Sequence, residues 1–214
     1  MLHWFLDVFL HLDVYLPQYF VQYGVVVYAL LFLIIFCETG LVVAPILPGD
    51  SLIFAAGAVA AMGRSNVLVL FFVLAAAAFL GNEVNYAIGR LIGRKLYEKP
   101  KHRFIKKENI DSAMAFFEKH GPVTIIITRF MPIIRTFAPF VAGIARMPKH
   151  VFTLYNLAGG FLWVLVFLAA GTFFGQQPFV KAHISMIMVG IVVISLLPAV
   201  IGRAAAWVRK RKQG

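Results

Sequence analysis

Charged residues and cysteine are both scarce in this chain of 214 residues. Only 14% of the residues are Asp, Glu, Lys or Arg, whereas soluble domains carry about 25%. Cys37 is the single cysteine, which excludes an internal disulfide and a multi-cysteine metal site. We interpret it as a small apolar side chain. The shortage of charge argues against an ordinary soluble domain.

Apolar residues take the place of the missing charge. They make up 61% of the chain, and the mean hydropathy is +0.86. The long apolar stretches predict one all-α integral membrane domain over residues 1–214. A net charge of +11 would also suit nucleic acid. The positive residues, however, gather in short segments beside apolar runs, so we expect them to set the topology and to contact anionic lipid instead.

Polar and apolar segments alternate along the chain in nine parts. In order, we predict an interfacial helix, a first span, a re-entrant hairpin, a second span, a basic cytoplasmic loop with an amphipathic helix, a second re-entrant hairpin, a third span, a fourth span and a basic tail, at residues 1–20, 24–37, 38–62, 67–89, 90–120, 121–146, 151–175, 184–207 and 208–214. The first part lacks a basic start and a small-residue cleavage site, so we do not expect a cleaved signal peptide.

Residues 121–146 are apolar but are interrupted by charge and proline. Arg129 and Arg135 lie inside the apolar run, and three prolines punctuate it: Pro122, Pro132 and Pro139. An arginine at the centre of a spanning helix costs roughly 2.5–3.5 kcal/mol, and proline breaks the helical hydrogen bonds. Broken backbone at membrane depth requires protein or a water-filled cavity around it. We therefore interpret this segment as a re-entrant hairpin.

Residues 38–62 have the same character. This segment opens with Glu38, breaks at Pro48-Gly49, continues with Asp50 and ends in an arm of small residues. The arms of the two segments also share local sequence, because Phe54-Ala-Ala-Gly57 aligns with Phe140-Val-Ala-Gly143. These features together predict an internal repeat.

The basic segments decide the topology. The loop at 90–107 and the tail at 208–214 are short, basic and adjacent to apolar runs, so both are expected in the cytoplasm. Because both segments lie on the same side of the membrane, the chain between them must cross it an even number of times. Three apolar segments lie between them, so one of these does not cross the membrane. Excluding both hairpins leaves four spans, with both termini cytoplasmic. The hairpins then enter from opposite sides and meet near the midplane, as in transporters built from inverted repeats.

Four charges would meet where the hairpins meet. Glu38 and Asp50 from the first hairpin would face Arg129 and Arg135 from the second. Left unpaired at membrane depth, the four would cost about 10 kcal/mol or more. We therefore expect mutual pairing, assisted by water. Simpler roles are open: Asp50 is also placed to cap a helix, and the arginines could serve only to hold the hairpin together.

Other residues are candidates for supporting this site. They are Pro48, Gly49, Glu83, Asn85, Tyr86, Pro132, Gly143, Asn156, Gly159 and Trp163. We interpret Asn156, Gly159 and Gly160 chiefly as helix-packing and interhelical hydrogen-bonding residues. Trp163 lies in the middle of a predicted span, where it either packs against a hairpin or lines the transport path. For Asn85 and Tyr86 both a structural and a functional role are open.

Several long motifs resemble the DedA family of bacterial inner-membrane proteins, which share the VTT domain. They are CETGLVVAPILPGDSLIFAAG, GNEVNYAIGRLIG, EKHG, TRFMPIIRTFAPFVAG and YNLAGGFLWV. The resemblance implies that Glu38 and Asp50 are the essential acids of the family and that Arg129 and Arg135 are its essential arginines. Many members have Gly-Asp where this chain has Gly81-Asn82. Whether Glu83 replaces that carboxylate is open, since adjacent helical positions point about 100° apart.

The resemblance also implies a function. Related eukaryotic proteins are lipid scramblases, and bacterial members are proposed to translocate lipids such as undecaprenyl phosphate with the proton-motive force. The expected partners are thus a lipid with an anionic phosphate headgroup, protons and the bilayer, and self-association into a homo-oligomer is open. The rival hypothesis is a proton-coupled antiporter of a small solute or ion. We expect no enzyme, cofactor or metal, because HExxH and GxSxG motifs are lacking and no histidine lies near the four charges.

Overall fold

The computed structural model describes residues 19, 22–41, 49–93, 114–115, 117–131, 134–175, 177–178 and 190. Every regular element in these ranges is helical. In chain order the elements are α3 (Val25–Gly40), α4 (Gly49–Ala61), α5 (Val67–Ile88), the π-helical turn η1 (Gly89–Gly93), η2 (Gly121–Val123), α8 (Thr124–Ile127), η3 (Thr128–Phe130), α9 (Ile134–Ile144) and α10 (Lys149–Phe174). The basic tail and most of the basic loop lie outside the described residues, as do all of the predicted interfacial helix except Tyr19 and all of the predicted fourth span except Gly190.

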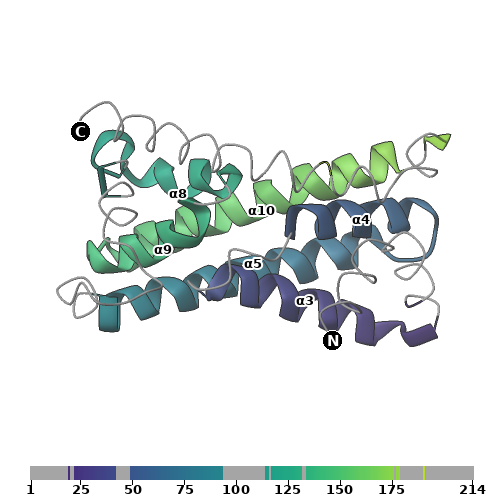
Figure 1. Ribbon diagram of the computed structural model, residues 1–214, viewed down its shortest axis with the longest axis horizontal. Helices are drawn as coiled ribbons and strands as arrows, with labels where there is room; N and C mark the ends of the chain where they lie inside the picture. The colour runs from purple at the N-terminus through teal and green to yellow at the C-terminus, as the bar shows by residue number, and fades with distance from the viewer. Residues whose placement is uncertain are drawn as a thin grey trace, which may run out of the picture.

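Two long helices form the axis of the molecule. The apolar segments Val67–Leu91 and Lys149–Phe174 have 25 and 26 residues and are long enough to cross a membrane, because a helix rises 1.5 Å per residue and the hydrocarbon core is about 30 Å thick. They occupy the ranges predicted for the second and third spans. In Figure 1 the two helices α5 and α10 run along the long axis, with α3 beside α5 and α4 beside α10.

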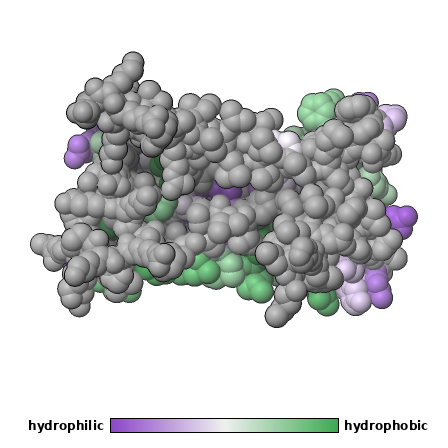
Figure 2. Space-filling view, viewed as in Figure 1, coloured by the Kyte–Doolittle hydropathy of each residue, from purple (hydrophilic) through white to green (hydrophobic). Residues whose placement is uncertain are grey.

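The outer faces of the long helices are apolar. Figure 2 shows hydrophobic residues along one edge of the molecule and hydrophilic residues near the two ends of its long axis. Large apolar side chains are exposed on α3, α5 and α10, including Val25, Leu30, Leu33, Leu68, Phe72, Leu154, Leu165 and Phe173. A surface of this kind is matched to lipid and not to water.

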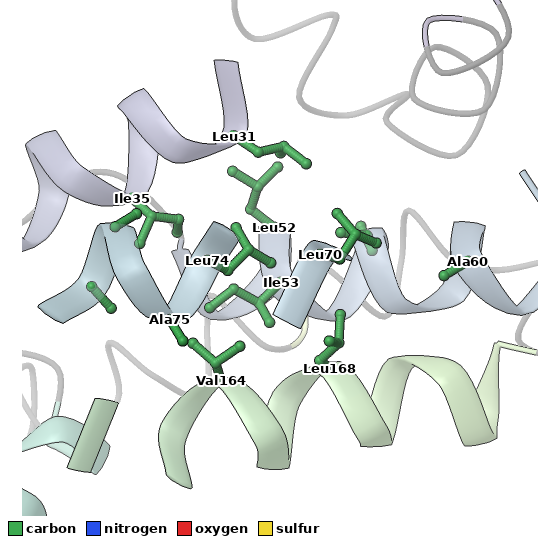
Figure 3. Packing of buried hydrophobic residues seen from close by; sticks show 14 of the residues in the cluster. Leu31, Ile35, Leu52, Ile53, Ala60, Leu70, Leu74, Ala75, Val164 and Leu168 are labelled. Carbon is green, nitrogen blue, oxygen red and sulfur yellow. The ribbon is translucent and has the colours of Figure 1, made fainter. Parts of the chain in front are cut away.

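The main core lies between α3, α4, α5 and α10. Leu31 and Ile35 of α3, Ile53 of α4, Leu74 of α5 and Leu168 of α10 belong to one buried cluster (Figure 3). Helix α4 is buried along nearly its whole length, from its first residue to the one before its last. A helix buried on all sides must be surrounded by protein, and its many small residues allow the neighbouring backbones to come close.

Helices α4 and α10 each place a glycine against a backbone carbonyl of the other helix. Gly171 lies against the carbonyl of Phe54, and Gly57 lies against the carbonyl of Leu168. A Cβ atom at either glycine would overlap the facing oxygen, so larger side chains are excluded at both positions. The two helices therefore pack at backbone contact.

Helix α9 packs in the same way at the end of α5. Gly89 lies against the carbonyl of Phe140, and Gly143 lies against the carbonyl of Tyr86. In both contacts the short helix, α4 or α9, contributes the pattern Phe-x-x-Gly. The long helix contributes a glycine and the carbonyl of the residue three positions before that glycine. The two segments with similar sequence thus make the same kind of contact with two different long helices, as a structural repeat would.

The structure changes two details of the predicted segments. Helix α3 continues through Gly40, so Glu38 lies in its last turn and does not follow the end of the first span. Residues 121–130 form three short turns, η2, α8 and η3, in place of one regular arm. The bends between the arms, residues 42–48 and 132–133, lie outside the described residues. Pro48 and Pro132 are therefore not placed, and the re-entrant path stays a prediction.

Candidate functional site

Arg135 joins the two predicted acids. It stands in the first turn of α9, and its Nη1 donates to Asp50 Oδ1 at 2.6 Å, while its Nη2 donates to Glu38 Oε1. Glu38 comes from the end of α3 and Asp50 from the start of α4, and their exposed fractions are 1% and 6%. Each of the two terminal nitrogens of the guanidinium thus makes a charge-assisted hydrogen bond. One arginine thereby ties three helices together.

Trp163 of α10 completes this ion-pair cluster. Its indole Nε1 donates to the same Asp50 oxygen at 2.9 Å, and its ring centroid lies 5.4 Å from Cζ of Arg135. Trp163 therefore contacts the start of α4, and it also lines the cavity described below, so both alternatives for this residue stay open. Asp50 does stand in the first turn of a helix, as a capping residue would. Its bonds to Arg135 and Trp163 show that capping is not its whole role.

Gly49 allows Glu38 to reach the cluster. A Cβ atom at this position would overlap Glu38 Oε2. The start of α4 therefore comes into direct contact with the carboxylate at the end of α3. This explains in packing terms why position 49 is a glycine.

Arg129 differs from the prediction of mutual pairing. It is 4% exposed, and its Nη2 donates at 2.6 Å to Oδ1 of Asn156, not to a carboxylate. Within the described part of the chain no ion pair is formed by Arg129. The cause is local: Arg129 lies in η3 against α10, where Gly159 and Gly160 leave room for its side chain.

Asn156 of α10 makes several hydrogen bonds to α5. Its Oδ1 also accepts from Asn82 Nδ2 at 3.1 Å. Its Nδ2 donates to Phe79 O and to Glu83 Oε1, each at 3.1 Å. Asn82 and Glu83 point in different directions on α5, yet both reach the single amide of Asn156. Glu83 is thus connected to Arg129 through one side chain.

Asn85 and Tyr86 connect α5 to neighbouring helices. Asn85 is fully buried, and its Nδ2 donates at 3.0 Å to the carbonyls of both Thr39 and Thr136. It therefore links the end of α3 to α9. Tyr86 stacks on Phe152 with ring centroids 4.3 Å apart. It also donates to a backbone carbonyl at 2.6 Å, so its observed contacts are structural.

A small cavity lies at the meeting point of these side chains. Its volume is about 10 Å³, room for about one water molecule. It is lined by Glu38, Thr39, Asn82, Arg129, Arg135, Thr136 and Trp163. A headgroup would require the surrounding helices to separate. Over the described ranges, no three His, Cys, Asp or Glu side chains come together as metal ligands would.

The sequence analysis missed Thr39 and Thr136 as lining residues. Each follows a predicted charged residue directly, Glu38 in one case and Arg135 in the other. That adjacency was the available signal. It was weak, because threonine is common in apolar helices and needs no site to explain it.

Comparison with known proteins shows the family of the chain. A family model described as the VTT domain matches residues 47–173, which is more than half of the chain. The chain is 49% identical over 203 residues to protein DedA of Escherichia coli K12, covering 94% of this chain and 93% of that protein. The chain belongs to the DedA family of VTT-domain membrane proteins. No solved structure matches it.

Two further DedA-family relatives are more distant. The chain is 40% identical over 205 residues to the uncharacterized membrane protein Rv0364 of Mycobacterium tuberculosis, covering 93% of this chain and 90% of that protein. It is 34% identical over 171 residues to the inner membrane protein YghB of E. coli K12, covering 80% and 78% respectively. The matched VTT region holds Asp50, Arg129 and Arg135, whereas Glu38 lies before it.

Proposed function

We propose that this protein moves a lipid with a phosphate headgroup, such as undecaprenyl phosphate or a phospholipid, across the bacterial inner membrane, coupled to protons. It acts as a translocase and not as an enzyme. The observation that carries the proposal is Arg135 held between Glu38 and Asp50, with the second buried arginine, Arg129, lining the same small cavity.

The chemistry of this cluster suits an anionic headgroup. A guanidinium fork binds phosphate oxygens through paired, charge-assisted hydrogen bonds. In the closed arrangement the carboxylates occupy the fork of Arg135. A phosphate must therefore displace them, and protons on Glu38 and Asp50 would weaken their hold. Binding of the headgroup and uptake of protons are thus linked by competition for one arginine.

The membrane setting follows from the relatives and the surface. YghB is named an inner membrane protein, and the exposed apolar faces of α3, α5 and α10 are matched to lipid. We place this chain in the inner membrane, with both termini cytoplasmic and its two hairpins entering from opposite sides. Glu38 and Asp50 are the proposed proton-coupling residues, and Arg129 and Arg135 the proposed headgroup-binding residues.

A second function is favoured by the size of the cavity. Its volume of about 10 Å³ fits a water or small ion without rearrangement, as a proton-coupled antiporter of a small solute would require. In that case Arg135 would only balance the charge of Glu38 and Asp50. The two functions make different demands on the geometry of the arginines.

The test is a headgroup-resolved flipping assay in proteoliposomes. Arg129→Lys and Arg135→Lys keep the positive charge but lose the planar fork, so both should fail to flip a phosphate lipid. A water-soluble polyprenyl phosphate analogue should compete with flipping by the wild type. Normal flipping by both lysine variants, without competition by the analogue, would favour the antiporter.

A further inference from the structure

We infer that the two arginines have different roles: Arg129 is the residue that first binds the phosphate group, and Asn156 keeps it available by separating it from Glu83. The inference rests on the proposed function and assigns a division of labour within the site. The observation behind it is the unequal distribution of carboxylates around two equally charged side chains.

Arg129 is surrounded by neutral groups. Its Nη2 donates to Asn156 Oδ1 at 2.6 Å and makes weaker contacts, at 3.4 Å, with the carbonyls of Ala78 and Asn156. Among the described residues its Nε has no hydrogen-bond acceptor. A buried charge without a counter-ion costs several kcal/mol. An arriving anion would therefore gain more at Arg129 than at Arg135, which two carboxylates already neutralise.

Asn156 lies between Arg129 and the carboxylate of Glu83. Arginine can only donate, so the oxygen of the Asn156 amide must face Arg129, and its nitrogen then faces Glu83. The two charges share one neutral side chain and do not touch. If residue 156 were an aspartate, the same geometry would place a carboxylate on Arg129. The amide at this position thus leaves Arg129 open to a phosphate monoester or inorganic phosphate.

The test exchanges the carboxylate and the amide between positions 83 and 156. Asn156→Asp alone would place a second carboxylate against that of Glu83. The double variant, Glu83→Gln with Asn156→Asp, keeps the net charge, and the new glutamine amide at position 83 can donate to the new carboxylate at position 156. The matched control is Glu83→Gln alone, which leaves Asn156 on Arg129. Asn66→Asp controls for the same change elsewhere, because Asn66 only caps α5 and aspartate caps equally well.

Binding is measured on the purified full-length protein in detergent with two probes, dodecyl phosphate and inorganic phosphate. Asn66→Asp should bind dodecyl phosphate as the wild type does, and the double variant should bind it at least tenfold more weakly than Glu83→Gln alone. Cooperative thermal unfolding of the double variant shows that it is folded, because Arg129 gains a carboxylate while the hydrogen bond from residue 156 to the carbonyl of Phe79 is lost. A loss of affinity smaller than tenfold would overturn the inference.

A second variant guards against misfolding of the first. Arg129→Gln keeps a polar N–H donor but carries no charge, so it too should bind at least tenfold more weakly; retained affinity would overturn the inference by itself. Failure of the proposed function and failure of this inference give different results. A wild type that binds neither probe removes the proposed function and this inference together. Inorganic phosphate bound as tightly as dodecyl phosphate keeps the anion site at Arg129 and removes the lipid.

Discussion

At the scale of single residues, the site depends on how many partners each charge has. Arg135 donates to Glu38 and Asp50 at once, while Arg129 donates only to neutral groups. Substitutions of these residues therefore leave different charges unbalanced. Removal of an acid leaves one ion pair in place, but removal of Arg135 leaves two buried carboxylates facing each other without a cation.

The first prediction follows from this asymmetry. Arg135→Gln should destabilise the protein more than Glu38→Gln or Asp50→Asn, because breaking a buried pair costs about 3–5 kcal/mol and Arg135 serves two pairs. Thermal unfolding of the detergent-solubilised protein measures the order. The exposed Arg64 supplies a control, and Arg64→Gln should change little. Equal stability of all three site variants would contradict the shared ion pair.

The second prediction concerns Trp163. Trp163→Phe keeps most of the ring but removes the hydrogen bond to Asp50, and hydrogen bonds to charged groups contribute about 1.5–3 kcal/mol. We expect lower stability and slower flipping while membrane insertion is retained. Parallel measurements of unfolding temperature and flipping rate check this. An unchanged unfolding temperature would show that the indole donor is not needed to hold Asp50.

At the scale of elements, the short arms α4 and α9 are each fixed by backbone contact with a long helix. We predict that Gly89→Ala and Gly171→Ala destabilise the protein by about 1–3 kcal/mol, because overpacking of close contacts has that cost. The added Cβ would overlap the carbonyl of Phe140 or Phe54. Gly190→Ala is the matched control, since no atom of the described part of the chain lies within 4 Å of a Cβ there. Comparable stability of all three alanine variants would contradict the close packing.

The same elements show what could be predicted from the sequence. Glu38, Asp50 and Arg135 were expected to meet, because charges in apolar segments have few partners to choose from. The partner of Arg129 was not predictable. It depends on the short turns of residues 121–130, which orient the side chain toward α10, and on the room left by Gly159 and Gly160. Contacts of this kind are fixed by tertiary packing and leave no local pattern.

At the scale of the whole molecule, topology is the open prediction. We expect single cysteines at positions 95, 103 and 211, in a protein lacking Cys37, to be shielded from an impermeant thiol reagent in intact cells. Cysteines at 65 and 178 should react once any outer barrier is opened. Labelling from outside at position 103 would contradict the arrangement of four spans and two hairpins.

The central claim is that the buried arginines recognise a phosphate on a lipid. The most direct measurement compares flipping rates in proteoliposomes for lipids with one chain and three headgroups: a phosphate monoester, phosphocholine and an uncharged alcohol. The account predicts that the monoester is moved much faster than the other two, and that Arg129→Lys and Arg135→Lys abolish this difference. Equal rates for the three headgroups, or flipping of none of them, would contradict it.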